Sequence, residues 1–248
     1  MRRGVTSGDR GAGSRGCIDS AFALPAYRDK VNTDMLDNIP LFTGLRKKDL
    51  DTIASHTLAK TFPAHTILLR EGTKSDSLYI ILYGKVKVYV GDDEGGEAIL
   101  NIQGAGEYFG EMALLDEAPR SASVMTMEST RVAMITKSAF KDCLAAHPDI
   151  AYNLIRSLTQ RVRGLSGSVR NLALLDVYGR VARTLIDLAQ PVDQHLVIAQ
   201  KLTHQNIADM VGASREMVSR ILKDLSNKGY IKVERRCITL FEKLARGR

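Results

Sequence analysis

Hydrophobic and polar positions in the first half of the chain follow a pattern typical of strands. Short apolar stretches separated by turn residues occupy residues 66–69, 78–82, 86–90, 98–102, 123–127 and 131–135. In one of them Val86, Val88 and Val90 point one way and the lysines, Lys85 and Lys87, lie opposite, which is the period of a half-buried strand. Many short strands at regular spacing predict a β sandwich or jelly roll over residues 62–136, preceded by a short helix over 48–55.

After Pro148 the apolar period becomes helical. Leucines and valines step by 4, 4, 3, 4 and 3 residues through Leu154, Leu158, Val162, Leu165, Val169 and Leu172. A seam of this heptad type predicts either a dimerisation helix or a helix packed on its own domain. Gly164 and Gly167 lie inside the seam and each weakens the helix by up to ~1 kcal/mol relative to alanine.

Two short amphipathic helices separated by a tight turn are predicted between Thr203 and Leu225. Gly212 permits the turn, and Ser214 is a good N-cap for the second helix. The apolar positions that would form one buried stripe are Ile207, Ala208, Val211, Val218, Ile221, Leu222 and Leu225. The polar positions on the outer side of the second helix are Arg215, Glu216, Ser219, Arg220 and Lys223. Because recognition helices present their first turns to base edges, this pattern favours a DNA-binding helix-turn-helix over an ordinary hairpin with a solvated charged face.

The flanks of this hairpin complete a winged arrangement. Asp176 is placed to cap a preceding helix over 177–189, which Pro191 ends. Two strands of a wing are expected over 230–233 and 237–240. The residues placed to reach phosphates or bases from outside the second helix are Arg235 and Arg236 in the wing and Thr203, His204 and Gln205 at the start of the first helix.

Charge is concentrated at the C-terminal end. The chain of 248 residues carries 35 Lys/Arg and 28 Asp/Glu, a formal net charge of +7. Residues 177–248 hold 13 Lys/Arg against 7 Asp/Glu, whereas residues 35–176 hold 16 against 17. This distribution suits a polyanionic partner at the C-terminal end, although a solvated basic face would give a similar count.

Composition excludes several classes of protein. No apolar run approaches the roughly 20 residues needed to span a bilayer, and no signal-peptide core is present, so we expect a cytoplasmic protein without a membrane partner. Cys17, Cys143 and Cys237 are too far apart for a zinc or iron–sulfur site and are expected to be reduced thiols. The five histidines are scattered, and no nucleophile–base or metal constellation suggests an enzyme.

Residues 1–33 lack periodicity and are predicted to be a disordered extension, or to lie upstream of a natural start at Met35.

The strongest candidate for a small-ligand site lies at Gly110 and Glu111, which open a short apolar helical turn. Free backbone N–H groups at such an end attract phosphate. Arg120 follows nine residues after Glu111 across a short loop, and its guanidinium is a forked cationic partner for a phosphate. Ser121 adds a further donor, and the Glu111 carboxylate can accept a hydrogen bond from a sugar hydroxyl. These groups predict a site for a ribose carrying a phosphate; the alternative is that Glu111 and Arg120 pair with each other.

Three blocks resemble the cyclic AMP receptor protein and fumarate–nitrate regulator (CRP/FNR) family of bacterial transcription factors. They run from Phe109 to Ala122, from Asn171 to Leu185 and from Val211 to Leu225, and the resemblance extends from about Met35 to the end. The resemblance implies an α+β chain with a cyclic-nucleotide-binding β jelly roll over 34–147, a dimerisation helix over 148–175 and a winged helix-turn-helix over 176–248.

The resemblance also implies roles for the ligand-site residues. Glu111 would take the ribose hydroxyl and Arg120 the cyclic phosphate, helped by Gly110 and Ser121. The family's adenine-reading threonine and serine correspond here to Leu165 and Ser166, so only Ser166 stays a candidate contact. The expected effector is therefore cyclic AMP first, with cyclic di-GMP or no ligand as alternatives. Cys17 alone cannot hold the iron–sulfur cluster of the fumarate–nitrate branch; haem sensing is left open.

On the DNA side, Arg215, Glu216 and Arg220 match the family's base-reading positions. The resemblance implies a homodimer that binds palindromic double-stranded DNA with TGTGA-like half-sites and contacts RNA polymerase. Arginine suits guanine and glutamate suits the amino group of cytosine. The rival class is a cyclic-nucleotide-binding regulatory subunit of a kinase or channel, which the basic hairpin disfavours.

Overall fold

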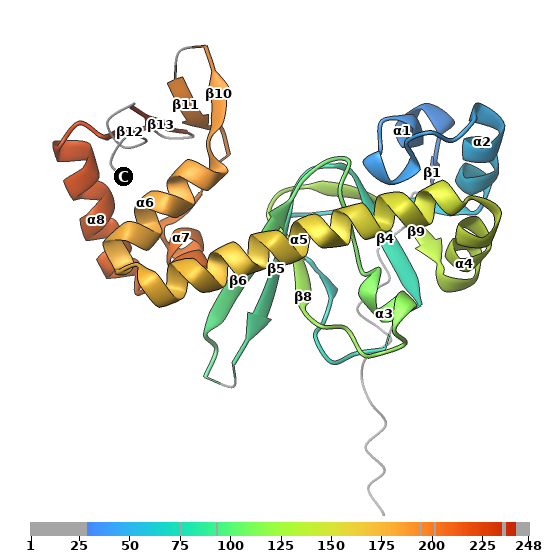
Figure 1. Ribbon diagram of the computed structural model, residues 1–248, viewed down its shortest axis with the longest axis horizontal. Coiled ribbons are helices and arrows are strands. Elements are labelled where there is room, and N and C mark those ends of the chain that lie inside the picture. The colour runs from blue at the N-terminus through green and yellow to red at the C-terminus, as the bar shows by residue number, and fades with distance from the viewer. Residues whose placement is uncertain are drawn as a thin grey trace, which may run out of the picture.

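The computed structural model describes residues 29–74, 76–92, 94–193, 195–200, 202–234 and 237–241. Two domains lie at the two ends of one long helix, α5 (Pro148–Leu174), as Figure 1 shows. The other helices are α1 (Thr33–Asp37), the 3₁₀ helix η1 (Pro40–Phe42), α2 (Lys47–Ser55), α3 (Met112–Leu115), α4 (Lys137–Ala146), α6 (Val177–Leu188), α7 (His204–Val211) and α8 (Arg215–Asn227). The predicted α+β class with an N-terminal β domain, a long helix and a C-terminal helix-turn-helix is confirmed.

The N-terminal domain is a sandwich of two antiparallel sheets. One sheet has the order β1-β2-β9-β4-β7 and the other β3-β8-β5-β6. Their strands are β1 (Asp29–Lys30), β2 (Thr57–Phe62), β3 (Ile67–Leu69), β4 (Ser77–Tyr83), β5 (Val86–Gly91), β6 (Glu97–Gln103), β7 (Tyr108–Phe109), β8 (Ser123–Thr126) and β9 (Thr130–Thr136). Apolar side chains from both sheets fill the space between them, among them Phe62, Ile81, Val86, Phe109, Val124 and Val132.

Helices cover the first of these sheets. Leu36 and Leu41 from the N-terminal helices, Phe140 from α4 and Ile150 from α5 form one core with strands β2, β4 and β9. Within the predicted extension, residues 1–28 lie outside the described part. Residues 29–33 belong to the folded domain instead, since Asp29 and Lys30 pair with β2, Val31 is buried and Thr33 begins α1.

Strand β5 departs from the predicted alternation. Val86 is buried as expected, but Tyr89 is the next buried residue, and Val88 and Val90 are half-buried. The register of β5 against β6 shifts between Val88 and Tyr89, because Leu100 of β6 is an extra residue between their partners Asn101 and Ile99. Strand β5 itself keeps an unbroken register against β8, so the bulge lies in β6.

The predicted seam on α5 divides into two parts. Leu154 is buried in the N-terminal core and Leu158 packs against it, so this half of the helix packs on its own domain. The exposed positions are Val162, Leu165, Val169 and Leu172, together with Ile155 on the same side. The helix runs through Gly164 and Gly167 without interruption. The first two seam positions are therefore core, and the last four form an apolar surface without a covering in the described chain.

The C-terminal domain packs α6, α7 and α8 on a four-stranded antiparallel sheet of order β10-β11-β13-β12. Its strands are β10 (Gln190–Val192), β11 (His195–Ile198), β12 (Ile231–Val233) and β13 (Ile238–Leu240). The predicted apolar stripe is buried throughout, and the two wing strands pair as expected. The Asp176 carboxylate accepts a hydrogen bond from the Gly179 N–H at 2.7 Å and caps α6, as predicted. Arg235 and Arg236 lie outside the described residues.

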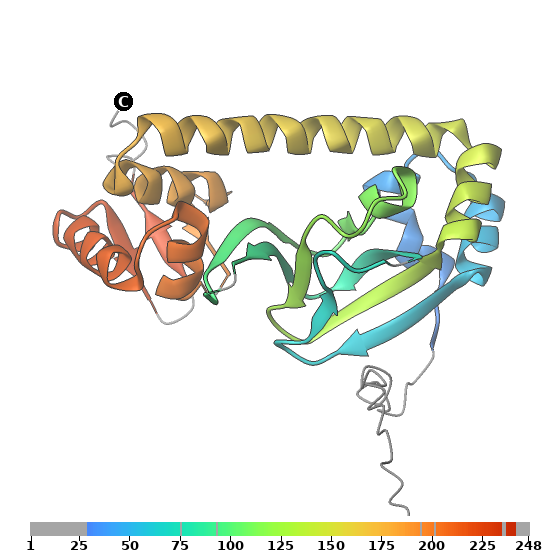
Figure 2. The same ribbon diagram turned by 90° about the horizontal axis from the view of Figure 1, so that it is seen from below.

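The two domains also touch away from α5. Figure 2 shows the β5–β6 hairpin reaching the C-terminal domain, where β6 lies against α7. Lys85 Nζ, at the base of this hairpin, donates a hydrogen bond to Gln200 Oε1 at 3.1 Å. None of the described helices is long and apolar enough to cross a membrane.

Candidate functional site

The candidate ligand site is built where β7 runs into α3. Gly110 has φ of +87°, a backbone conformation that side chains disfavour, and a Cβ added there would lie 2.6 Å from Arg120 Nη1. The close approach of Arg120 therefore requires glycine at this position. As predicted, the loop after α3 brings Arg120 back to Gly110.

Arg120 is held by backbone carbonyls. Its Nη1 donates to the Gly110 carbonyl and its Nη2 to the Ser77 carbonyl at 2.6 Å. Its own backbone is fixed to the β3–β4 loop, because Gly72 N–H donates to the Arg120 carbonyl at 2.8 Å and Arg120 N–H to the Thr73 carbonyl at 2.9 Å. The side chain is only 3% exposed, and burial lowers the pKa of the guanidinium while nearby Tyr79 and Glu111 oppose this shift.

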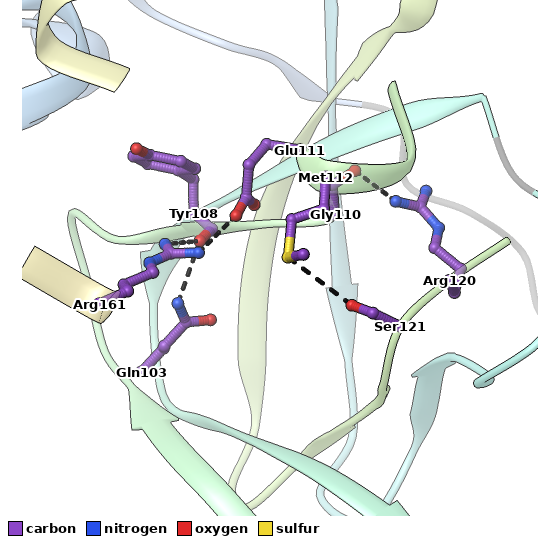
Figure 3. A network of polar contacts seen from close by, with 8 residues as sticks. All are labelled: Gln103, Tyr108, Gly110, Glu111, Met112, Arg120, Ser121 and Arg161. Carbon is purple, nitrogen blue, oxygen red and sulfur yellow. Dashed lines mark hydrogen bonds and ion pairs between the residues drawn. The ribbon is translucent and has the colours of Figure 1, made fainter. Parts of the chain in front are cut away.

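Glu111 pairs with Arg161 of α5, not with Arg120. Arg161 Nη1 lies 2.6 Å from Glu111 Oε1, and Arg161 Nη2 donates to the Tyr108 carbonyl at 2.6 Å (Figure 3). Glu111 is 1% exposed, and burial raises the pKa of its carboxyl while Arg161 works against this shift. Its second oxygen, Oε2, is buried and has no hydrogen-bond partner among the described residues. The alternative that Glu111 and Arg120 simply neutralise each other is thus wrong.

Arg161 was missed by the sequence reasoning. It lies three residues after Leu158 and seven after Leu154, so it shares the helix face that packs on the N-terminal domain. An arginine on a buried face requires an acceptor, and Glu111 was the candidate carboxylate. Counting charged residues as well as leucines along the seam would have indicated this pair.

The two predicted serines lie differently. The exposed Ser121 has its Oγ 3.7 Å from the Met112 sulfur, next to Glu111 and on the same side as Arg120 (Figure 3). Ser166 is exposed on α5 and donates to the Val162 carbonyl of its own helix at 2.9 Å. Within one chain, then, Gly110, Glu111, Arg120 and Ser121 come together and Ser166 does not join them.

The chemistry of this group suits an anion that carries a hydroxyl. Arg120 and Arg161 flank Glu111, so two cations surround one carboxylate. The unpartnered Glu111 Oε2 is a buried acceptor, which is costly unless a donor reaches it. A ribose hydroxyl supplies such a donor, and the forked guanidinium of Arg120 suits a phosphate.

The candidate DNA-binding surface is the first part of α8, at the outer end of the C-terminal domain (Figure 1). Ser214 caps the helix by accepting a hydrogen bond from the Met217 N–H at 3.2 Å, and Gly212 with φ of +61° makes the turn before it. The exposed candidates are Ser214, Arg215, Glu216, Arg220 and Lys223, whereas Ser219 is half-buried. Across the part of the chain that can be described, no ion pair engages these charged groups.

The start of α7 is held more tightly. Thr203 and Asn206 form a capping box, with the Asn206 N–H donating to Thr203 Oγ1 at 3.0 Å and the Thr203 N–H to Asn206 Oδ1 at 3.1 Å. Gln205 is exposed and donates to Asp209 Oδ1 at 2.6 Å, and His204 is half-buried. Contacts of these residues with DNA stay a prediction.

Arg180 of α6 was not predicted and fixes the turn of the hairpin. Its Nε donates to the Val211 carbonyl at 2.8 Å and its Nη1 to the Leu175 carbonyl at 3.0 Å. One side chain thus joins the end of α7 to the end of α5. A cation at a helix C-terminus also interacts favourably with the helix dipole and so stabilises the helix.

No cluster of three or more histidine, cysteine, aspartate or glutamate side chains among the described residues is placed to hold a metal ion. The described cysteines, Cys143 and Cys237, are both free.

Comparison with known proteins finds matches to both domains in which these candidate sites lie. Residues 59–147 match the cyclic nucleotide-binding domain, and residues 179–246 match the Crp-like helix-turn-helix domain. The chain is 32% identical over 219 residues to the CRP-like cAMP-activated global transcriptional regulator of Mycobacterium tuberculosis, covering 86% of this chain and 98% of that protein. It is 38% identical over 196 residues to the cAMP-activated global transcriptional regulator CRP of Haemophilus influenzae, covering 77% and 88%. Among solved structures, the c-di-GMP responsive global regulator CLP of Xanthomonas campestris gives a TM-score of 0.69 at 26% identity, covering 79% of this chain and 99% of that chain.

Proposed function

The chain belongs to the CRP/FNR family of transcription regulators, and on that premise we propose that it is a homodimer which binds palindromic operators under the control of a cyclic nucleotide. Membership of this family makes the chain a DNA-binding regulator with a cyclic nucleotide-binding domain. As a regulator of bacterial genes it acts in the cytoplasm, on DNA and together with RNA polymerase, and it is not an enzyme.

One observation carries the DNA-binding part of the proposal. Arg215, Glu216 and Arg220 project from the first two turns of α8 without ion pairs in the described structure, although Glu216 and Arg220 are spaced for an i,i+4 pair. Charged groups left available at this end of a recognition helix suit hydrogen bonding to base edges. Arginine contacts to guanine and a glutamate contact to cytosine support TGTGA-like half-sites.

The exposed part of the α5 seam supports the homodimer. Val162, Leu165, Val169 and Leu172 follow a heptad spacing and are exposed in the single chain. A second copy of α5 would cover them, and a two-fold axis along this seam would present two α8 helices to the two halves of a palindrome.

Glu111 and Arg161 supply a physical link from the ligand to the dimer. The acceptor proposed for the ribose hydroxyl is already held by a side chain of α5. A ligand that donates to Glu111 therefore changes the surroundings of Arg161 and biases the position of α5, provided that it binds the two dimer states with different affinity. Repositioned α5 helices would then set the separation of the two α8 helices.

Cyclic AMP is the first candidate for the effector, because the M. tuberculosis and H. influenzae relatives are cAMP-activated regulators. Cyclic di-GMP is the second, since the X. campestris regulator of similar structure responds to it. Because Leu165 stands where the family has its adenine-reading threonine, this position favours neither cyclic AMP nor cyclic di-GMP.

Calorimetric titration and operator binding test the proposal together. Cyclic AMP, cyclic GMP and cyclic di-GMP are titrated into the protein, and binding to a TGTGA palindrome and to a scrambled duplex of equal length is measured by fluorescence anisotropy at one moderate salt concentration. We expect one nucleotide to bind and to tighten binding of the protein to the palindrome but not to the scrambled duplex.

Equal affinity for both duplexes would contradict base reading. A lack of any effect of millimolar cyclic nucleotide on operator affinity or melting temperature would contradict effector control. Absence of any salt-dependent binding to DNA would favour a regulatory subunit instead.

A further inference from the structure

Gln103, at the end of β6, is a buried polar residue that the sequence analysis did not single out. It is 1% exposed, although glutamine is seldom fully buried. Its partner across the β5–β6 ladder is Val86, a buried residue whose apolar side chain can form no hydrogen bond with the amide. An amide in such a position calls for polar partners from another direction.

Among the described residues, the Gln103 amide has a hydrogen-bond partner at its nitrogen and none at its oxygen. Gln103 Nε2 donates to the Tyr108 carbonyl at 3.1 Å, whereas Gln103 Oε1 is buried without a hydrogen bond within the described residues. The orientation of the amide is fixed by this contact, because a carbonyl can only accept, so the nitrogen must face Tyr108. The oxygen is therefore left as a buried acceptor that requires an external donor.

Gln103 is linked by hydrogen bonds to residues of the candidate ligand site. The Tyr108 carbonyl accepts hydrogen bonds from both Gln103 and Arg161, and Arg161 in turn holds Glu111. Gln103 and Arg161 thus meet at one atom, and Figure 3 shows the Gln103 oxygen turned away from the arginine. Gln103 Oε1 and Glu111 Oε2 are two unpartnered acceptors on the two sides of this bonded group.

The order of the groups indicates which part of a nucleotide would meet Gln103. Figure 3 shows Arg120 on one side of Glu111, and Arg161 and Gln103 on the other. With the phosphate at Arg120 and the ribose hydroxyl at Glu111, the base extends toward Gln103. The hydrogen-bond donor that a purine base offers outside its ring is an exocyclic amino group.

We propose that Gln103 reads the base of the effector by accepting a hydrogen bond from an exocyclic amino group of a purine cyclic nucleotide. This inference rests on the proposed function, since it requires a cyclic nucleotide at Glu111 and Arg120. It assigns base recognition to the sheet, whereas Leu165 on α5 offers no polar group.

Two pairs of nucleotides, each differing by one amino group, test the inference. Cyclic AMP is compared with the cyclic phosphate of purine riboside, which lacks the 6-amino group, and cyclic GMP with cyclic IMP, which lacks the 2-amino group. Dissociation constants are measured by calorimetry for the wild-type protein and for Gln103→Met, which keeps the shape of the side chain and removes the acceptor. Ser121→Ala is the matched control at the phosphate end, and melting temperatures report folding.

In at least one pair the wild type should prefer the amino-bearing nucleotide by about ten-fold, the factor expected of one hydrogen bond. Gln103→Met should bring the two affinities of that pair within about two-fold of each other, whereas Ser121→Ala should weaken both without changing their ratio. Equal affinities in both pairs for the wild type would overturn the inference, even if Gln103→Met does not fold. The same conclusion follows if Gln103→Met keeps the preference. If no cyclic nucleotide binds the wild type, the proposed function fails and the inference fails with it.

Discussion

Glu111 is a buried carboxylate whose charge is balanced by Arg161 from a distant part of the sequence. Burial raises the pKa of this carboxyl above its ordinary value of 4.5, and Arg161 only partly opposes the shift. A carboxyl group that holds its proton more tightly in the folded than in the unfolded state favours folding most at low pH. Its contribution to the free energy of unfolding therefore falls as pH rises from about 4.5 through the raised pKa of the folded state.

Replacing Glu111 with glutamine should remove this pH dependence. The free energy of unfolding of the wild type relative to Glu111→Gln is expected to decrease as pH rises through that window. Urea denaturation at several pH values measures the difference, and Glu128→Gln, at an exposed position, gives the baseline. A constant difference between wild type and Glu111→Gln across the window would contradict the raised pKa.

Gly110 offers a second test at the residue scale. An alanine there combines an unfavourable φ of +87° with a Cβ only 2.6 Å from Arg120 Nη1, so the guanidinium must move. We expect a loss of about 1–3 kcal/mol in the free energy of unfolding and a loss of cyclic nucleotide binding. Gly106→Ala is the matched control, because Gly106 also has φ of +87° but its nearest neighbour, Pro40 Cδ, is 3.8 Å away. Similar nucleotide affinities for the two variants would show that Arg120 is not the cause.

At the scale of elements, α8 is a helix whose buried and exposed faces are fully separated. Val218, Ile221, Leu222 and Leu225 anchor it, while its N-terminal turns carry the charged groups. Arg180 holds the preceding turn by bonding to the Val211 carbonyl. The position of the first turn of α8 is therefore set by the packing of these apolar side chains and by the Arg180 clamp, the hydrogen bonds by which Arg180 holds the turn.

Arg220→Ala should weaken binding to the matched operator by about 1–3 kcal/mol and relax preference at one base pair of each half-site. Arg220→Lys should show much of the same loss, because lysine lacks the forked donor that fits guanine. Lys223→Ala, by contrast, should weaken all duplexes similarly and reduce the salt dependence. Anisotropy titrations on single-base operator variants distinguish these outcomes, and an equal loss on matched and mismatched half-sites would contradict base reading by Arg220.

The strands of the N-terminal domain differ in how well the sequence pattern predicts them. The apolar runs predicted six strands of the N-terminal domain, because each carries a compact group of branched or aromatic residues. Strand β2 was missed since Thr57 and Ala59 supply much of its buried face, and these residues carry little apolar signal. The bulge in β6 and the Arg161–Glu111 pair depend on contacts between distant segments, which periodicity within one segment does not contain.

At the scale of the whole molecule, the exposed seam on α5 is an apolar surface that no described part of the chain covers. Val169 is 65% exposed in the single chain, so an aspartate there costs the monomer little. In a two-fold dimer the same aspartates would face each other in an apolar seam, and their mutual repulsion and desolvation should dissociate it.

Sedimentation analysis of Val169→Asp should therefore show a monomer with an unchanged melting transition at high dilution. Tyr83→Asp, at a position 61% exposed on the N-terminal domain, should stay dimeric. A dimeric Val169→Asp protein would place the interface elsewhere.

The unbroken course of α5 has a thermodynamic consequence. The same helix holds Glu111 through Arg161 near its middle and meets the Arg180 clamp at its C-terminal end. Any factor by which a nucleotide tightens operator binding must equal the factor by which the operator tightens nucleotide binding, because free energy around a closed cycle sums to zero. Titrating nucleotide into the protein with and without bound duplex should return two affinities whose ratio matches the activation measured from the DNA side.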